Sequence, residues 1–525
     1  MRLSGEGSIP DGWLARLDLR AVVWTLAAIL ATAAALPAVW WRQLHPDEVV
    51  VLTIAPQSLG EILDEVFVER GGAPVHFFVE HVLLAWPGGM EGLRLPSFVF
   101  FLLALPAAGL VAERLVDRTA ALVLVPTLAI APLAVELATF GRMYSLFLAA
   151  TLWATYLALV AADRAQPPLW AAAGVALGLL VYVHPIAPLY IGIALASALV
   201  HGWRGFRTML RTAWPGVVAM VVVGLPFHLM SLSTLKTRYN VHPRRDRLQT
   251  ESGDSVIDLA LQRILPGGRP GQVAFALFGL AGLVYLARTR PRSAVVLALW
   301  IVVPSAFFAL LPAEGTAFFA RYVLAALPYV LLAVVVGALS LARGRLGTAG
   351  TVAAALAILS LLATAAYRDV ERLRDLAASD LPGLIAGVER VRHDGVLFSS
   401  VVSPHLDSSV ALEVEGLPHV ESDCSELAPY LAGPSTPRRG IWVLNGAGYE
   451  LARGLKRLGA RDDVDVERIG ANIVLVTSRN ALAPRELVTL GLDLRDAWFA
   501  EGGTSLSERV AQQEARALAG ECLGE

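Results

Sequence analysis

Two adjacent carboxylates, Asp47 and Glu48, follow the first long apolar segment of the chain, residues 21–41. A carboxylate at the mouth of a membrane segment is costly to bury, but it can accept a proton from a hydroxyl group that approaches from water. Position alone favours a hydrated loop start over a catalytic base. The role of the pair therefore depends on what the rest of the chain places around it.

Several arginines are suited to binding an anionic substrate. Arg142 and Arg321 each adjoin an apolar segment, and a guanidinium can hold two phosphate oxygens at once. The alternative is that these side chains extend to lipid headgroups. Tyr144 is a candidate hydrogen-bond partner of the same substrate, or an aromatic residue of the membrane interface. Arg244 and Arg245 are further candidates, although a charge cluster in a loop can simply be hydrated.

Three histidines, His76, His81 and His184, are candidates for binding a sugar or a phosphate, or for bonding to a neighbouring helix. The alternative for His76 and His81 is a divalent-metal site that also uses His45 and Asp47. His76 and His81 are five residues apart, so they do not share one helix face as residues four apart would. We therefore predict neither a metal nor another cofactor.

The composition indicates a membrane protein. Of the 525 residues, 56% are hydrophobic and only 17% are charged, and the mean hydropathy is +0.59, which is too apolar for a soluble chain. The net charge is -2 and no basic patch alternates with aromatic residues, so nucleic-acid binding is excluded. The two cysteines, Cys424 and Cys522, fit a disulfide or two free thiols equally well.

Apolar runs long enough to cross a bilayer recur along the chain and predict about eleven spans. They lie near residues 21–41, 94–116, 119–139, 144–162, 168–183, 185–201, 213–232, 271–287, 293–311, 321–341 and 348–367.

Arginine-rich breaks alternate with the other breaks between these spans. The positive-inside rule places the arginine-rich set in the cytoplasm. The N-terminus is then cytoplasmic, while Asp47 and everything after Tyr367 are extracytoplasmic. Two outer loops are long, residues 42–93 and 233–270. The first contains two segments, 59–69 and 75–86, that could be helices at the membrane surface, and the charge pattern of 59–69 is amphipathic.

The composition changes after Tyr367. Strand-like runs at 395–402, 440–444 and 471–477 alternate with helical patterns at 381–392 and 449–458, which favours a small α/β domain. We therefore divide the chain into a membrane domain, residues 1–367, and an extracytoplasmic α/β domain, residues 368–525. No glycine-rich phosphate-binding motif follows any of the predicted strands.

Four ordered stretches of the membrane domain resemble the bacterial polytopic glycosyltransferases of the GT-C fold, such as protein O-mannosyltransferases and lipid A aminoarabinose transferases. The stretches are Asp47-Glu48, Ala73-Pro74-Val75-His76-Phe77-Phe78 with His81, Leu93-Arg94-Leu95-Pro96-Ser97, and Gly141-Arg142-Met143-Tyr144-Ser145-Leu146. Two shorter matches follow, Tyr182-Val183-His184 and Arg321-Tyr322-Val323-Leu324. Together they cover roughly residues 40–330. The family often has a glutamate where Phe140 stands here, and Glu136, one helical turn earlier, is a candidate substitute.

The resemblance implies an inverting transferase that moves a sugar from a polyprenyl-phosphate carrier to an acceptor hydroxyl at the outer face of the plasma membrane. Asp47 is then the base, and Glu48 orients or binds the acceptor, which can be a glycan, a lipid or a protein. Membrane lipids surround the domain. Arg142 and Arg321 are expected to hold the phosphate.

Two rival functions remain. A lipid or sugar transporter, or a flippase, would favour inverted repeats and ionisable groups near the membrane midplane. No paired repeat is evident, and the suggestive charges cluster at the outer edge. A membrane anchor for the C-terminal domain would not need so many spans.

Overall fold

The computed structural model describes residues 18–41, 46–68, 73–84, 89–241, 268–310, 320–379, 381–398, 414, 417–420, 436–445, 455–469 and 473–499. The chain divides into two compact units. The first consists of residues 1–40 and 54–370, and the second of residues 41–53 and 371–525.

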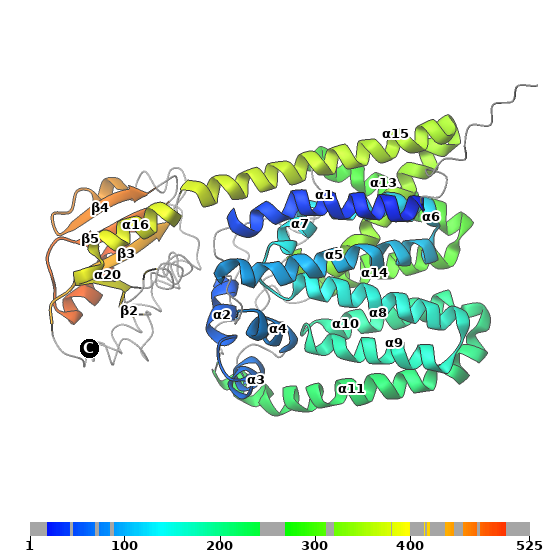
Figure 1. The fold of residues 1–525 in the computed structure, drawn as a ribbon, viewed down its shortest axis with the longest axis horizontal. Coiled ribbons are helices and arrows are strands. Elements are labelled where there is room, and N and C mark those ends of the chain that lie inside the picture. Colours follow the sequence, from blue (N-terminus) through cyan, green and yellow to red (C-terminus); the bar gives the residue numbers. More distant parts are fainter. Residues whose placement is uncertain are drawn as a thin grey trace, which may run out of the picture. The chain divides into compact units, whose positions relative to one another are not determined.

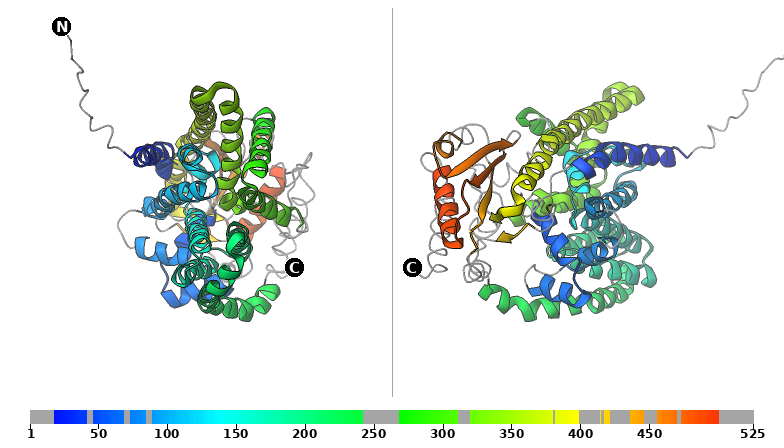
Figure 2. Two further views of the ribbon diagram at one scale, coloured as in Figure 1. Left: turned by 90° about the vertical axis from the view of Figure 1, so that its right-hand side faces the viewer. Right: turned by 60° about the vertical axis from the view of Figure 1, so that its left-hand side comes forward.

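The first unit is a bundle of helices (Figure 1), and the end-on view shows them packed side by side (Figure 2). Its long helices pack on one another in a connected series, with α5 against α8, α8 against α9, and α9 against α11. The helices that begin in this unit are α1 Leu19–Trp41, α3 Leu59–Val68, α4 Val75–Leu84, α5 Gly89–Leu115, α6 Arg118–Ala129, α7 Pro132–Ala138, α8 Tyr144–Arg164, α9 Pro167–Leu179, η2 Leu180–Tyr182, α10 Ala187–His201, η3 Trp203–Gly205, α11 Phe206–Val241, α13 Gly268–Thr289, α14 Pro291–Leu310, η4 Ala320–Ala326 and α15 Leu327–Ser379.

The outer surface of the bundle is apolar. Large side chains such as Trp214 and Val222 on α11, and Leu277 and Leu280 on α13, are exposed. Among the described residues, six helices are long and apolar enough to cross a membrane, or seven if the bent pair α6 and α7 forms one span. Shorter apolar helices, including α10, accompany them. An apolar surface of this extent belongs in lipid, so the protein is an integral membrane protein.

Close helix packing is supported by small residues. A methyl group on Gly174 of α9 would lie 2.0 Å from the carbonyl oxygen of Gly216 on α11. The two backbones can approach this closely because neither residue has a side chain. This contact fixes α9, and with it the turn that follows η2.

The predicted span at 119–139 corresponds to two helices rather than one. α6 and α7 meet at a break with a bend of 56°. The break precedes Pro132, which has no N–H to donate and disfavours a helical conformation at Ala131. The bend turns the chain so that α7 leads into the segment around Arg142.

Two other spans differ at their ends. α11 continues to Val241, beyond the predicted end at residue 232. The spans predicted at 321–341 and 348–367 correspond to η4 and α15, and Gly347 interrupts α15 with a φ of 57°. α15 then runs past the predicted domain boundary to Ser379.

The predicted outer loop 42–93 is largely helical. The helices expected near 59–69 and 75–86 are present as α3 and α4. A third helix, α2 Pro46–Ile54, was not predicted. Its run of three valines, Val49 to Val51, has no helical periodicity, and β-branched residues weakly disfavour a helix.

The second unit contains a five-stranded sheet in the order β2-β1-β3-β5-β4 (Figure 1). The strands are β1 Gly395–Phe398, β2 His419–Val420, β3 Arg439–Asn445, β4 Val464–Ile469 and β5 Ile473–Ser478. β1 pairs in parallel with β2 and β3, whereas β5 is antiparallel to β3 and β4. Helix α16 Leu381–Val391 packs Leu384 and Val388 among buried side chains of the sheet. Helix α20 Pro484–Phe499 packs Leu487 and Leu494 into a second cluster, which contains Trp442. The strands predicted at 395–402, 440–444 and 471–477 and the helix predicted at 381–392 are present, and β2 and β4 were missed. Most of the helix predicted at 449–458 lies outside the described residues.

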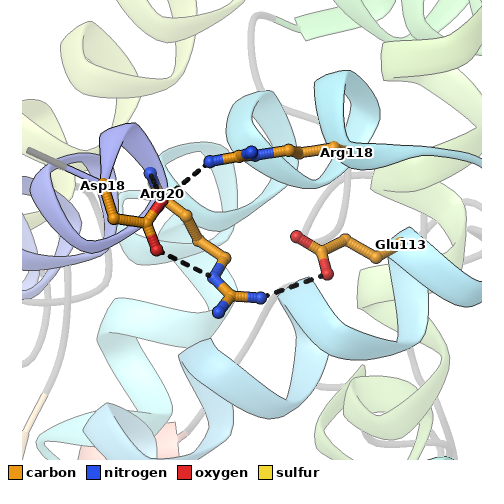
Figure 3. Close-up of polar contacts among 4 residues, drawn as sticks. All are labelled: Asp18, Arg20, Glu113 and Arg118. Atoms are coloured by element: carbon orange, nitrogen blue, oxygen red, sulfur yellow. Dashed lines mark hydrogen bonds and ion pairs between the residues drawn. The ribbon is translucent and has the colours of Figure 1, made fainter. Parts of the chain in front are cut away.

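One end of the helical bundle is held by exposed ion pairs (Figure 3). Asp18, which precedes α1, lies 2.7 Å from Arg118 of α6, and Arg20 lies 3.5 Å from Glu113 of α5. Arg114 of α5 pairs with Asp163 of α8, whose other oxygen lies 2.8 Å from His201 Nε2. Breaks predicted to share one side of the membrane are therefore joined here, as a consistent threading requires.

Candidate active site

The turn between α7 and α8 positions Arg142. A methyl group on the preceding Gly141 would lie 2.5 Å from Leu93 Cγ, so only glycine lets the turn approach α5 this closely. Ser97 Oγ, one helical turn along α5, donates a hydrogen bond of 3.0 Å to the Arg142 carbonyl. The guanidinium lies over the ring of Phe77 on α4, at 5.8 Å. Three of the motif stretches thus meet at this residue.

Arg94, from the same stretch of α5, has a different role. Its side chain is buried, and Nη1 donates a hydrogen bond of 3.0 Å to the carbonyl of Val39 in the last turn of α1. A cation at a helix C-terminus stabilises the carbonyl groups that have no partner within the helix. Arg94 therefore joins α1 to α5.

Arg321 lies close to the same place, at the start of η4. Its guanidinium lies over the ring of Tyr144, at 5.3 Å, and over that of Tyr322, at 5.9 Å. The carbonyl of Tyr322 accepts a hydrogen bond of 2.6 Å from the hydroxyl of Tyr190 on α10. Tyr190 in turn stacks on Trp300 of α14. The backbone that carries Arg321 is thus fixed by buried aromatic residues of two other helices.

His184 lies between these arginines, in the turn that joins η2 to α10. The backbone N–H of Ile186 donates to Nδ1 over 3.1 Å, so in the neutral ring the proton is on Nε2. Burial, and then the charges of Arg142 and Arg321, lower the pKa of His184 to about 3. Nε2 is buried and has no hydrogen-bond partner among the described residues. His184 is therefore a neutral donor whose proton is available to a ligand.

Aromatic rings enclose this group. The ring of His184 lies 4.8 Å from that of Phe147 and 5.7 Å from those of Tyr144 and Tyr322. Phe140, which stands where the related family often has glutamate, stacks on Tyr144 at 5.8 Å. Glu136, the candidate substitute, is half-buried on α7.

Five of the predicted substrate-binding residues come together in this region. We call Arg142, Tyr144, His184 and Arg321, with their ring contacts, the arginine cluster. His76 adjoins it, because its Nε2 donates to the Gly141 carbonyl over 3.2 Å.

The structure does not place the other predicted substrate-binding residues, His81, Arg244 and Arg245, in the arginine cluster. His81 donates from Nδ1 to the carbonyl of Ala55 over 2.8 Å, so it joins α4 to the turn that leads into α3. Arg244 and Arg245 lie outside the described residues, as do Cys424 and Cys522.

Both predicted catalytic carboxylates lie on α2, in the second compact unit. Glu48 is fully buried, which differs from the hydrated loop start that position alone suggested. The side chain of Asp47 lies outside the described part of the chain. The roles of Asp47 and Glu48 stay predictions.

Sequence reasoning missed several residues that shape this region. Glu80 is fully buried on α4, with Oε1 3.9 Å from His76 Nδ1. The i, i+4 spacing of an acidic residue and a histidine was a usable signal. Tyr190 carried no local signal, because its role depends on contact with η4, far along the chain.

The arrangement is suited to binding an anion with several oxygens. Two half-buried guanidiniums and one buried imidazole N–H lie among aromatic rings, so each electrostatic contact is stronger than it would be in water. Among the described residues, no three His, Cys, Asp or Glu side chains come together as metal ligands. The absence of a metal stays a prediction.

Comparison with known proteins finds one matching family model and several similar structures. The family model described as dolichyl-phosphate-mannose-protein mannosyltransferase matches residues 73–229, which include His76, Arg142, Tyr144 and His184. No curated protein matches the chain in sequence.

Two solved structures are similar over most of the chain. ArnT from Cupriavidus metallidurans in the apo state has 15% sequence identity and a TM-score of 0.54, covering 87% of this chain and 97% of that chain. The same protein bound to undecaprenyl phosphate has 14% identity and a TM-score of 0.54, covering 89% and 98%. The chain therefore has the GT-C fold of membrane glycosyltransferases, and the resemblance seen in the motifs is confirmed.

Proposed function

We propose that the protein transfers a sugar from a polyprenyl-phosphate carrier to an acceptor hydroxyl, with inversion at the anomeric carbon. The observation that carries this proposal is the arginine cluster, in which Arg142, Arg321 and the free N–H of His184 are gathered at one end of a lipid-facing bundle. The family model that includes three of the cluster residues, and the ArnT structure that contains undecaprenyl phosphate, support the same chemistry.

The reaction needs a base and a site for the leaving group. Asp47 takes the proton of the acceptor hydroxyl as its oxygen attacks the anomeric carbon. The bond between that carbon and the phosphate oxygen breaks, and its electron pair stays on the departing polyprenyl phosphate. Arg142 and Arg321 stabilise the charge that develops there, and His184 Nε2 donates to one of its oxygens. A single displacement of this kind inverts the anomeric carbon. Glu48 orients or binds the acceptor.

The positive-inside rule supports an orientation. The ion-paired end, with Arg20, Arg114 and Arg118, faces the cytoplasm of a plasma-membrane protein, and the N-terminus is on that side. The arginine cluster and the C-terminal α/β unit are then extracytoplasmic. The acceptor is a hydroxyl group of a glycan, a lipid or a protein.

Consumption of a lipid-linked sugar tests the proposal. Purified protein is incubated with polyprenyl-phosphate mannose or polyprenyl-phosphate arabinose and with cell-envelope extract as acceptor, and release of polyprenyl phosphate is measured. The wild-type protein should release it, and Asp47→Asn should reduce the rate by at least about 10³-fold with expression and folding unchanged, because the amide cannot act as a base. Turnover of Asp47→Asn at the wild-type rate would exclude Asp47 as the base.

A further inference from the structure

Helix α4 carries a buried polar pair that the proposed reaction does not use. Glu80 is fully buried and His76 is 1% exposed. They are four residues apart on α4, with Nδ1 of the histidine 3.9 Å from Oε1 of the glutamate. We call these two residues the His76–Glu80 pair.

Stability alone is a poor explanation for such a pair. Removing two polar groups from water is costly, and replacing a buried pair by apolar side chains of similar volume is often neutral or stabilising. Buried polar pairs are best attested where they select one arrangement of the chain among several. The His76–Glu80 pair is therefore expected to select one conformation of a segment that it contacts.

The contacts of His76 point to the turn that carries Arg142. Nε2 donates to the carbonyl of Gly141 over 3.2 Å, and Nδ1, on the other side of the ring, lies 3.9 Å from Glu80, which is an ion-pair rather than a hydrogen-bond distance. The imidazolium form has an N–H on each nitrogen, so it can donate to Gly141 while the carboxylate attracts it. The next carbonyl, that of Arg142, accepts from Ser97 over 3.0 Å. Two successive peptide groups are thus held from two different helices, α4 and α5. The Gly141 contact exists only while the ring of His76 keeps its orientation.

Sequence neighbours support the same interpretation. Phe77, next to His76, carries the ring beneath the Arg142 guanidinium. A shift of α4 or of the turn would therefore change both the backbone and the side-chain contacts of Arg142. The turn itself is short, since the Arg142 N–H bonds to the Phe140 carbonyl over 2.6 Å, and it has little capacity to absorb such a shift.

We propose that the His76–Glu80 pair is a positioning device: Glu80 orients His76, His76 holds the Gly141 carbonyl, and the turn thereby directs Arg142 toward the phosphate of the sugar donor. The proposal rests on the proposed function for the identity of the ligand. It replaces the prediction that His76 binds substrate, and it assigns a role to Glu80. Neither residue contacts the reacting atoms in this account.

The test compares a variant that lacks the His76–Glu80 pair with a variant that keeps only the hydrogen bond to the Gly141 carbonyl. The double variant His76→Phe/Glu80→Leu removes both polar groups and roughly keeps their volume. His76→Gln keeps an N–H that can reach the Gly141 carbonyl. Ser293→Ala is the matched control, because it removes a buried hydrogen bond to the Leu115 carbonyl at the ion-paired end of the bundle. Thermal stability, affinity for undecaprenyl phosphate, and amide hydrogen exchange of the segment 139–146 are measured on the full-length protein.

The double variant should keep its thermal stability, bind undecaprenyl phosphate about 10- to 100-fold more weakly, and exchange the amides of 139–146 faster, because a misdirected arginine loses the phosphate contact. His76→Gln should restore most of the affinity, and Ser293→Ala should change neither the affinity nor the exchange. A double variant with wild-type affinity and wild-type exchange would overturn the proposal. If the exchange rises in the double variant but the wild-type protein does not bind undecaprenyl phosphate, the proposed function fails while the positioning of the turn stands.

Discussion

Arginines gather at both ends of α8, and the two groups have opposite surroundings. At the C-terminal end, Arg20, Arg114 and Arg118 lie near carboxylates of other segments, and their side chains are 26–59% exposed. Figure 3 shows the contacts of Arg20 and Arg118. At the N-terminal end, Arg142 and Arg321 are half-buried against the rings of Phe77, Tyr144 and Tyr322. The 21 residues of α8 separate the two groups by about 30 Å.

The two groups contain the same residue type, so the surroundings of an arginine decide whether it can join helices or bind an anion. Exposed ion pairs are each worth about 0–1 kcal/mol, because water screens them and the side chains lose entropy. A guanidinium among aromatic rings interacts more strongly with any charge that enters the same space. The first end can therefore hold helices together and set topology, while the second can bind an anion.

Truncating an arginine of the arginine cluster should reduce turnover more than any other change at either end of α8. Arg142→Ala and Arg321→Ala should each reduce turnover of a polyprenyl-phosphate sugar by about 10²–10³-fold, because a donor to the departing phosphate is lost. Arg321→Lys should also fall well below wild type, since an ammonium cannot replace the two-pronged contact. Steady-state kinetics on purified protein measures this. Equal turnover of Arg142→Ala and wild type would remove Arg142 from the site.

The close approach of Gly141 to Leu93 on α5 predicts a smaller loss, in the affinity for undecaprenyl phosphate. Gly141→Ala places a methyl group against Leu93 and should weaken undecaprenyl phosphate binding by about 10-fold, because the turn must move away from α5. Gly192→Ala is the matched control, since it has open space around the added methyl group. Binding titrations of the two variants measure the effect. An affinity for Gly141→Ala as high as that of Gly192→Ala would show that the turn tolerates displacement.

The lowered pKa of His184 predicts a dependence of stability on pH. The unfolded histidine, with a pKa near about 6.5, binds a proton that the folded one resists until about pH 3. This contribution to stability is therefore complete above the unfolded pKa and is lost as the pH falls below it, by up to about 1.4 kcal/mol per pH unit. Thermal unfolding of the wild type between pH 7 and 5 should fall more steeply than that of His184→Gln. Parallel curves for the two proteins would show that His184 is not held neutral.

The ion-paired end should show the smallest effects. Arg118→Ala removes the contact with Asp18 and should lower the free energy of unfolding by at most about 1 kcal/mol. Turnover should stay at the wild-type value, which makes this variant the charge-matched control for Arg142→Ala. A loss of turnover comparable to that of Arg142→Ala would mean that the two ends do not differ as described.

Much of the fold could be predicted from the sequence because apolar runs and arginine-rich breaks are local signals. The break before Pro132 was also a local signal and was missed, since the apolar run continues through it. The short strand β4 was missed although Val464, Val466 and their acidic neighbours alternate as a strand requires.

The residues of the candidate site that lie in recognisable motifs could be predicted from the sequence. His76, Arg142, Tyr144, His184 and Arg321 were each named from short stretches, and the structure brings them together. What could not be predicted was the role of each residue. The sequence does not reveal that His76 faces a backbone carbonyl, that Tyr190 holds η4, or that His81 bonds to Ala55, because these contacts join segments that are distant in the chain.

The central claim is that the arginine cluster, and not the ion-paired end, binds the phosphate of the donor. A structure of the full-length protein with undecaprenyl phosphate tests it most directly. We expect phosphate density within hydrogen-bonding distance of the Arg142 and Arg321 guanidiniums and of His184 Nε2. Phosphate density beside Arg20 and Arg118, with none at the arginine cluster, would contradict it.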